Sequence, residues 1–260
     1  MGSELEEQIE EVAELIVDSK TLVVFTGAGV STESGIPDFR SPGGIWERYN
    51  PEDFTYQKFL SGPEARRKVW ERFRLFGMLA AIEPNPAHYA IAELDKLGKL
   101  DCVITQNVDG LHQRAGVPED KVIELHGTLK WVKCLGCHKL YPTEEIIKRL
   151  EQGVEEPVCD DCGGILKSAT IAFGEPMPVK ETTEAERRSR NCDLMLVLGS
   201  SLVVYPAAYM PIYAMESGAK LVIINIGPTP MDNYAKVRIH EKAGEVMSRI
   251  VERVKSRIAS

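Results

Sequence analysis

Four cysteines carry the most specific chemical signal in this sequence. Cys134 and Cys137 form one C-x2-C pair, and Cys159 and Cys162 form a second. Two such pairs at this separation are typical of zinc ribbons. Because four thiolates complete a tetrahedral Zn²⁺ site and leave no open position, we expect one structural ion rather than a catalytic one. The alternative is four reduced cysteines without a metal.

A glycine turn after an apolar run is a second candidate site. Residues 21–26 are apolar and rich in β-branched side chains, which predicts a buried strand, and Gly27, Ala28 and Gly29 follow directly. Glycines let a backbone approach a pyrophosphate, and the N–H groups at a helix start attract an anion. The match to G-x-G-x-x-G is incomplete, since Thr32 stands where the third glycine is expected. The alternative is an ordinary tight turn between strand and helix.

Polar side chains also follow two later apolar runs. Gln106, Asn107 and Asp109 come after one of them, and His126 comes after the next. Open α/β sheets bind ligands at the carboxyl ends of their parallel strands, so these side chains should meet at one edge. A lone histidine after a strand is more often structural. An amide, a carboxylate and an imidazole that converge are instead typical of an active site.

Between these sites lies a segment, 34–44, with too many glycines and prolines for regular structure. A long irregular segment beside a phosphate site is usually a functional loop. Asp38, Phe39 and Arg40 place an acid, an aromatic ring and a cation there, although a solvated loop is the alternative. No strand ends in an acid about twenty residues after Gly29, which argues against an ordinary hydride-transfer enzyme.

Composition limits the class of protein. The chain has 260 residues, of which 43% are hydrophobic and 27% charged, so one large α/β domain with a small insertion fits its length. The net charge of −8 argues against sequence-independent nucleic-acid binding, which needs a basic surface. We see no secretion signal and no apolar run long enough to cross a membrane, so we expect a cytoplasmic protein with reduced or metal-bound cysteines.

The elements that must position these residues alternate between strands and helices. Strands are expected at about 21–26, 102–105, 122–125, 169–173, 194–198 and 221–224. Helices are expected at about 4–19, 63–82, 88–97, 180–190, 205–217 and 241–258. The helix over 63–82 has an apolar face that includes Leu79 and Ala80.

Taken together, the motifs resemble those of the sirtuins, the NAD-dependent protein-lysine deacylases. The resemblance covers residues 10–255 and rests on six ordered motifs. They are Gly27-Ala28-Gly29-Val30-Ser31 with Gly35-Ile36-Pro37-Asp38-Phe39-Arg40, Thr105-Gln106-Asn107-Val108-Asp109-Gly110-Leu111-His112, His126-Gly127, the four cysteines, Phe173-Gly174-Glu175, and Gly199-Ser200-Ser201.

The resemblance implies a fold and two domains. The expected fold class is α/β, a Rossmann-like parallel sheet with helices on both faces, plus a small zinc-ribbon and helical insertion domain. The large domain would comprise residues 1–42, 84–130 and 168–260, and the small one residues 43–83 and 131–167. NAD would lie between them, with the acylated lysine entering from the opposite side.

The resemblance also implies a reaction. In sirtuins the acyl oxygen attacks C1′ of the nicotinamide ribose, which releases nicotinamide and leads to O-acetyl-ADP-ribose and free lysine. His126 would be the general base, a role that suits an imidazole whose pKa lies near working pH. Asn107 and Asp109 would orient the ribose and the nicotinamide amide.

The implied contacts form two sets. Those to NAD are Gly27, Ala28, Gly29, Thr32, Asp38, Phe39, Arg40, Gln106, Asn107, Val108, Asp109, Gly199, Ser200, Ser201, Asn225 and Ala243. Those to an acetylated lysine in a protein or peptide substrate are Phe173, Gly174, Glu175 and Val203.

The sequence departs from the common family pattern at two places. Ser41 stands where many sirtuins have Gly, and Ser168-Ala169 where Pro-Asp is frequent. Sirtuins that prefer succinyl groups carry a Tyr and an Arg before the Pro-Asn motif, and a gapless count places Trp70 and Phe73 there. This predicts removal of acetyl or longer aliphatic groups, with little activity on succinyl-lysine.

Two rival functions stay open at this point. The same cleft could transfer ADP-ribose to a protein or hydrolyse NAD. A non-enzymatic zinc-ribbon adaptor is the second rival, although the presence of His126, Asn107 and Asp109 argues against it. The oligomeric state cannot be read from the sequence.

Overall fold

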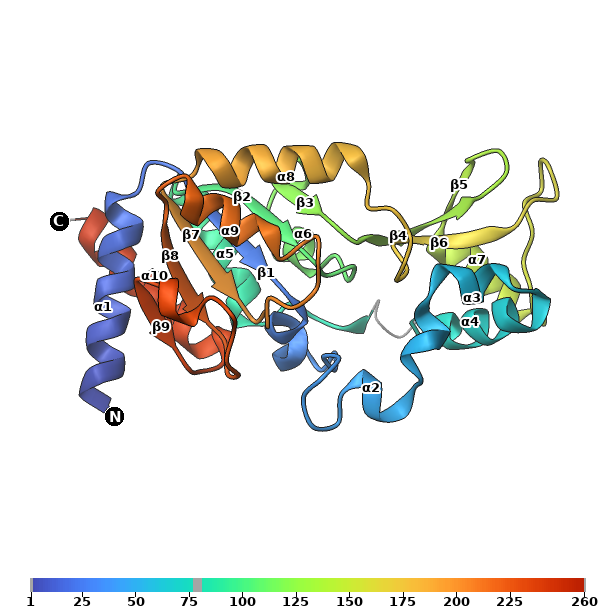
Figure 1. Cartoon of the computed structure of the whole chain (residues 1–260), viewed down its shortest axis with the longest axis horizontal. Coiled ribbons are helices and arrows are strands. Elements are labelled where there is room, and N and C mark those ends of the chain that lie inside the picture. The colour runs from blue at the N-terminus through green and yellow to red at the C-terminus, as the bar shows by residue number, and fades with distance from the viewer. Residues whose placement is uncertain (1, 77–80, 260) are drawn as a thin grey trace.

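The computed structural model describes residues 2–76 and 81–259, and its largest element is a six-stranded parallel sheet (Figure 1). The strands lie in the order β3-β2-β1-β7-β8-β9. They are β1 (Leu22–Thr26), β2 (Leu100–Thr105), β3 (Val122–Glu124), β7 (Leu194–Leu198), β8 (Lys220–Ile224) and β9 (Val237–Ile239). Counted within this sheet alone, the order is 3-2-1-4-5-6, that of doubly wound dinucleotide-binding sheets. The order reverses beside β1, so the crevice of such a sheet lies at the end of β1.

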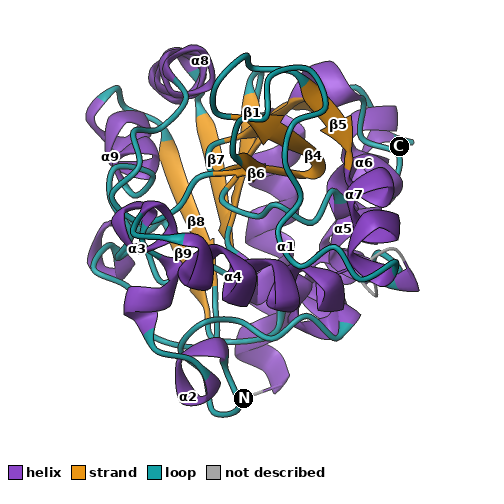
Figure 2. Cartoon of the chain, turned by 90° about the vertical axis from the view of Figure 1, so that its right-hand side faces the viewer, coloured by secondary structure: helices purple, strands orange, loops and turns teal. Residues whose placement is uncertain are grey.

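Helices cover both faces of this sheet. One apolar layer packs α1 (Gly2–Asp18), α5 (Pro86–Lys96) and α10 (Ala243–Ile258) against the strands. The other packs α8 (Val179–Asn191) and α9 (Tyr209–Glu216), which Figure 2 shows together on one side of the strands. Because β1 and β7 are buried along their whole length, both faces must be apolar, which explains their continuous hydrophobic sequences.

A second, antiparallel sheet has the order β5-β4-β6. Its strands are β4 (Gly127–Cys134), β5 (Leu140–Pro142) and β6 (Leu166–Thr170), and its helices are α3 (Tyr56–Leu60), α4 (Pro63–Phe76) and α7 (Thr143–Glu151). We call these six elements the small region; Figure 1 shows them at the opposite end of the molecule from the two termini. A separate apolar cluster holds them together. Two further short helices are α2 (Ile45–Arg48) and α6 (Leu111–Arg114).

The expected fold class is confirmed, and several element boundaries are corrected. The strand expected at 169–173 is β6, Leu166–Thr170, so the chain leaves the sheet before Phe173. The helix expected directly after the glycine turn is a short 3-10 helix, η1 (Ala28–Ser34). Helix α9 begins at Tyr209 rather than near 205. β4, β5, β9 and α7 were not predicted. In the helix expected over 63–82, Leu79 and Ala80 lie outside the described residues.

Within the described residues, no helix combines the length and the apolar character needed to cross a membrane.

Candidate active site and metal centre

The expected site residues gather at the carboxyl edge of the large sheet. Backbone hydrogen bonds continue past the strand ends, since Gln106 N–H donates to Thr26 O (3.0 Å) and Gly199 N–H to Ile224 O (3.0 Å). The side chain of Gln106 donates to Ser200 Oγ (2.8 Å), which joins the end of β2 to the end of β7 across β1. The turns after β1, β2 and β7 therefore form one continuous edge.

The glycines after β1 are required by packing within the protein. A Cβ at Gly29 would lie 2.8 Å from Gly199 O, and one at Gly27 would lie 2.8 Å from Ser200 Cβ. Gly199 has φ +60°, and its Cβ would lie 2.2 Å from Val30 N. The two turns thus touch backbone to backbone. Side chains at these positions would force the edge apart before any ligand is considered.

Asn107, Ser31 and Asp109 form a hydrogen-bonded group on this edge. Asn107 Nδ2 donates to Ser31 Oγ (3.1 Å) and to Gly27 O (3.2 Å), and Ser31 Oγ donates to Asp109 Oδ2 (2.8 Å). Asp109 Oδ1 accepts the Leu111 N–H at the start of α6 (3.0 Å). Asn107 is buried, while Asp109 is partly exposed. Ser31 holds both residues but was not among the predicted contacts, although it belongs to the quoted glycine-turn motif.

His126 has a defined tautomer. Its Nδ1 lies 3.0 Å from Gln106 O, and because a carbonyl only accepts, Nδ1 carries the hydrogen in the neutral ring. The lone pair is then on Nε2. Partial burial lowers the pKa of His126, and the hydrogen bond to Gln106 only partly offsets this effect. The ring is therefore neutral at pH 7, as a proton acceptor must be.

A buried polar layer lies behind Asn107. Thr26 Oγ1 donates to Thr105 Oγ1 (2.8 Å) and contacts His112 Nε2 (2.9 Å), and Thr105 Oγ1 accepts the Asn107 N–H (3.0 Å). The His112 and His88 rings lie 4.9 Å apart, between centroids. Burial lowers the pKa of His88 to about 4, with partial compensation from Asp109. The His88 ring also closes a capping box with Asn85 at the start of α5.

The loop with Asp38, Phe39 and Arg40 lies beside α2. Asp38 accepts the backbone N–H groups of Arg40 (3.0 Å) and Ser41 (2.8 Å) as well as the Ser41 hydroxyl (2.5 Å). Ser41 therefore adds a hydrogen bond that a glycine could not make. The Phe39 ring packs on Trp46 (5.0 Å between centroids), and the Arg40 side chain is exposed. Trp46, which sequence reasoning missed, also lies 5.9 Å from the ring of Phe173.

The remaining expected NAD contacts lie after the carboxyl ends of the strands, and one of them is buried. Ala28 begins η1, and Thr32 donates to Gly29 O within it (2.8 Å). Val108, Ser201 and Asn225 are partly exposed in the turns after β2, β7 and β8. Ala243 is different, because it is buried at the start of α10 beside Gly244, whose N–H binds the Glu33 carboxylate (2.8 Å).

The residues expected to meet an acyl-lysine lie on two segments. Val203 and Phe173 are exposed, the first after β7 and the second after β6. Phe173 N–H donates to Phe54 O (3.1 Å), and its carbonyl accepts the Tyr56 N–H (2.9 Å). Gly174 has φ +79°, which favours glycine. The segment after β6 is therefore tied to the start of α3.

Trp70 and Phe73 occupy another place than the gapless count suggested. Their side chains are 1% and 3% exposed, and both belong to the apolar cluster of the small region, with Ile146 and Leu166. Helix α4 turns this face toward the second sheet and α7, which a count along the sequence cannot reveal. The acyl-chain preference drawn from these two residues therefore loses its basis.

The four cysteines come together as predicted. Their sulfur atoms all lie within 4.8 Å of one another, with 3.5 Å between Cys134 and Cys162 and between Cys137 and Cys159. A tetrahedral zinc site with Zn–S bonds of about 2.3 Å requires sulfur atoms roughly 3.8 Å apart, so the cluster fits Zn²⁺. A Cβ at Gly164 would lie 2.9 Å from Cys134 Sγ, so only glycine leaves room there.

Hydrogen bonds favour the thiolate form of Cys134 and Cys159. At Cys137 and Cys162 a backbone hydrogen bond also favours the thiolate, but contacts with the neighbouring sulfurs outweigh it and raise the pKa. Cys134 Sγ accepts the backbone N–H groups of Gly136 (3.3 Å) and Cys137 (3.4 Å). The Tyr141 hydroxyl donates to Cys159 Sγ (3.2 Å), and this bond is the main reason that the pKa of Cys159 falls to about 6. Thiolates are the form that binds metal.

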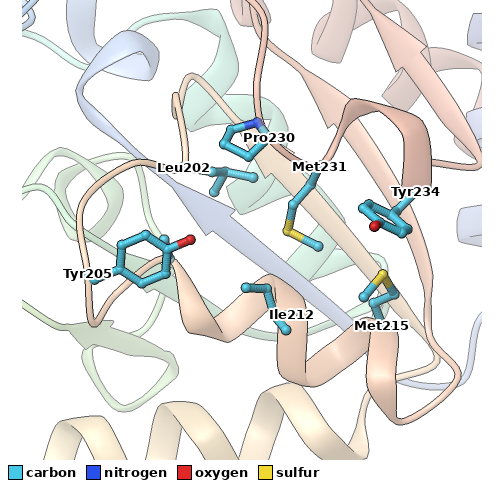
Figure 3. Close-up of a pocket in the computed structure, with 8 residues that line it drawn as sticks. Leu202, Tyr205, Ile212, Met215, Pro230, Met231 and Tyr234 are labelled. Carbon is cyan, nitrogen blue, oxygen red and sulfur yellow. The ribbon is translucent and has the colours of Figure 1, made fainter.

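An apolar pocket lies outside this site. It has a volume of about 230 Å³ and is lined by Leu202, by Ile212 and Met215 of α9, and by Met231 and Tyr234 of the segment after β8 (Figure 3). None of the predicted contacts lines it, and its wall is mostly apolar. The predicted contacts therefore lie on the sheet edge and its loops, not in this pocket.

Several known proteins are similar to this chain in sequence. The family model described as Sir2 family matches residues 27–206. A relative from Thermodesulfovibrio yellowstonii, named NAD-dependent protein deacetylase, is 47% identical over 96% of each chain. One from Archaeoglobus fulgidus, named NAD-dependent protein deacylase 2, is 46% identical over 96% of this chain and 98% of its own.

A solved structure is also similar. A Sir2 variant with a deacetylated p53 peptide and 3′-O-acetyl ADP-ribose superposes with a TM-score of 0.87 at 42% identity, covering 94% of this chain and 97% of that one. The sequence, the sheet order and the four-cysteine cluster thus agree, and the sirtuin resemblance is confirmed: the chain belongs to the Sir2 family.

Proposed function

We propose that this protein is an NAD-dependent protein-lysine deacetylase. The reaction converts acetyl-lysine, NAD and water into lysine, nicotinamide and O-acetyl-ADP-ribose. The observation that carries the proposal is the tautomer of His126, whose Nε2 lone pair is available at the same sheet edge as Asn107 and Asp109. Relatives at 47% and 46% identity with deacetylase and deacylase names support it.

NAD, when bound, supplies the ribose carbon that loses nicotinamide and receives the acyl oxygen. The turns at Gly27–Gly29 and Gly199–Ser201 are the residues that would hold it, together with Gln106 and Asn225. Asn107 and Asp109 are fixed by Ser31, so they can orient polar groups without first losing side-chain freedom. Phe39 would cover the reacting face, and the exposed Arg40 would meet phosphate.

His126 would act as the general base. With Nδ1–H bonded to Gln106 O, Nε2 accepts the proton of a ribose hydroxyl, and the imidazolium keeps its Nδ1–H bond to that carbonyl. Phe173, Gly174, Glu175 and Val203 would form the binding site for the peptide that carries the acetyl-lysine. The substrate is thus a lysine side chain on a protein or peptide.

The four cysteines would hold one structural Zn²⁺, because no ligand position remains for water. We propose the domain division given above, with residues 43–83 and 131–167 as the small domain. A cytoplasmic location is proposed because a four-cysteine site needs a reducing compartment. The net charge of −8 supports a protein substrate and no direct nucleic-acid binding.

The test is to incubate the zinc-loaded protein with NAD and an acetyl-lysine peptide and to follow nicotinamide and peptide mass together. Deacetylation predicts peptide-dependent nicotinamide release with loss of the acetyl group. Release without peptide would instead identify an NAD hydrolase, and a peptide mass gain of ADP-ribose would identify a transferase.

A further inference from the structure

Lys167 of β6 is a buried ammonium whose function the proposed reaction does not explain. The residue is 5% exposed. Its Nζ lies 2.9 Å from Glu175 Oε2 and donates to the carbonyl oxygens of Thr170 (2.5 Å) and Ser168 (3.3 Å). The three acceptors match the three hydrogens of an ammonium group. A buried charge of this kind persists only when it is paired and fully hydrogen-bonded.

The bonds of Lys167 close a turn over residues 170–175, which we call the 170–175 turn. Glu175 Oε2 also accepts the Ala172 N–H (2.9 Å), and Glu175 N–H donates to Ala172 O (3.0 Å). The chain has left β6 at this point, so the turn is held from outside by backbone hydrogen bonds at Ile171 and Phe173, and from within by the contacts of Glu175. The ion pair is therefore the main restraint inside the turn.

The 170–175 turn touches both sides of the proposed reaction site. On one side, Ile171 N–H donates to His126 O (2.8 Å), and Gly127 packs so tightly that a Cβ there would lie 2.0 Å from Ala169 O. On the other side, Phe173 exchanges hydrogen bonds with Phe54 and Tyr56. A displacement of the turn would therefore move the peptide contacts relative to the general base.

We propose that Lys167 is a positioning residue for deacetylation, and that its pair with Glu175 holds the 170–175 turn in the conformation that binds the acyl-lysine peptide. The inference rests on the proposed function. Removing the ammonium leaves the Glu175 carboxylate half-buried without its partner, so the turn opens to hydrate it. Peptide binding then weakens, while the NAD contacts in the turns after β1, β7 and β8 stay in place.

The experiment compares Lys167→Gln and Lys167→Arg with a matched control. Lys133 is the partner of Lys167 in the β4–β6 register, but its side chain is exposed, so Lys133→Gln removes the same charge without breaking the turn. Steady-state kinetics give separate KM values for the acetyl-lysine peptide and for NAD. Loss of substrate binding appears as a higher KM, so we expect the peptide KM of Lys167→Gln to rise by about tenfold, which corresponds to about 1.4 kcal/mol of lost binding. The NAD KM should stay unchanged, as should both constants of Lys133→Gln.

Three results would overturn the inference: an unchanged peptide KM in Lys167→Gln, a parallel rise in both KM values, or an arginine variant no better than the glutamine variant. If Lys167→Gln does not fold, Glu175→Gln decides by hydrogen exchange in the absence of peptide, a measurement that does not depend on any contact between Glu175 and the peptide. The Ile171 amide, which binds His126 O, must then exchange faster than in wild type, and an unchanged rate would overturn the inference. Wild-type protein in the same assay separates the two proposals. No deacetylation there refutes the proposed function, whereas wild-type activity with unaltered variants refutes only the role of Lys167.

Discussion

The six-stranded sheet lies between two layers of buried apolar side chains, whereas the small region has one limited cluster that includes Cys134 and Cys159. We call the six-stranded sheet with α1, α5, α8, α9 and α10 the large region. There, the hydrophobic effect alone provides a core on each face of the sheet. In the small region, two of the buried side chains are expected metal ligands. The comparison teaches that the large sheet can fold by burial, while the small region needs zinc to complete its core.

The largest expected effect is loss of the metal. Cys134→Ser, or chelation of zinc, should unfold the small region and abolish activity, since apparent zinc binding in small structural sites contributes about 10–16 kcal/mol to folding. Trp70 and Trp131 lie on α4 and β4, so tryptophan fluorescence should report this loss. Hydrogen exchange of β1 and β7 amides should stay slow. Fast exchange in those strands would show that the two regions do not differ in this way.

A substitution at Gly127 should have the next largest effect. Gly127 begins β4, so it lies at the junction where the chain passes from the large sheet into the small region. Gly127 and Gly98 both have φ +71°, but a Cβ at Gly127 would lie 2.0 Å from Ala169 O, whereas one at Gly98 meets nothing within 4 Å. Gly98→Ala should lower the free energy of unfolding by about 1–2 kcal/mol, the cost of a left-handed alanine. Gly127→Ala must also displace β6, so urea denaturation should show a larger loss, together with reduced activity. Equal losses would mean that the junction is not tightly packed.

Protonation of His88 should lower the free energy of unfolding of the large region at acid pH. The unfolded chain protonates this ring below about pH 6.5, while the folded one does so only below about 4. The unfolded state then binds more protons in this window, so stability present at pH 7 is lost as the pH falls, by about 3 kcal/mol at pH 4. Urea denaturation at both pH values should show a smaller difference for His88→Asn than for wild type. The control is His240→Asn, because His240 is exposed. If His88→Asn loses as much unfolding free energy between pH 7 and pH 4 as wild type does, the prediction is contradicted.

A smaller effect concerns the pH dependence of activity. Burial lowers the pKa of His126. The midpoint of the acid limb in the pH profile of kcat/KM should therefore lie below the ordinary histidine pKa of about 6.5. Activity is then lost only when the pH drops below that value, because the base must be neutral. A limb that lies above the ordinary value would show that the imidazolium is favoured in the site.

How far the sequence predicts the structure also differs between the two regions. In the large region, continuous apolar runs such as 194–198 predict five of the six strands, because a strand buried on both faces has a distinct composition. The sixth, β9, has only three residues and was missed. In the small region, β4 alternates irregularly between buried and exposed positions, so its sequence carries no such pattern. The cysteine spacing still predicted the metal centre, since that signal needs no strand assignment.

The candidate site residues show the same contrast between features that the sequence pattern predicts and features that depend on packing. Asn107, Asp109 and His126 were predictable because polar groups after buried strands must meet at one edge. Trp70 and Phe73 were misplaced, because the face that α4 turns toward its neighbours depends on packing. Ser31 and Trp46 were missed, since their roles come from contacts made only in the folded chain: Ser31 with Asp109, and Trp46 with Phe39 and Phe173.

The most direct test of the proposed reaction separates its two halves in His126→Ala. Exchange of labelled nicotinamide into NAD in the presence of acetyl-lysine peptide reports cofactor binding and nicotinamide release, while peptide mass reports deacetylation. A base that acts after nicotinamide has left predicts that exchange persists while deacetylation falls by roughly 10²–10⁴-fold. Loss of exchange together with loss of NAD binding would contradict the assignment of His126 as the general base.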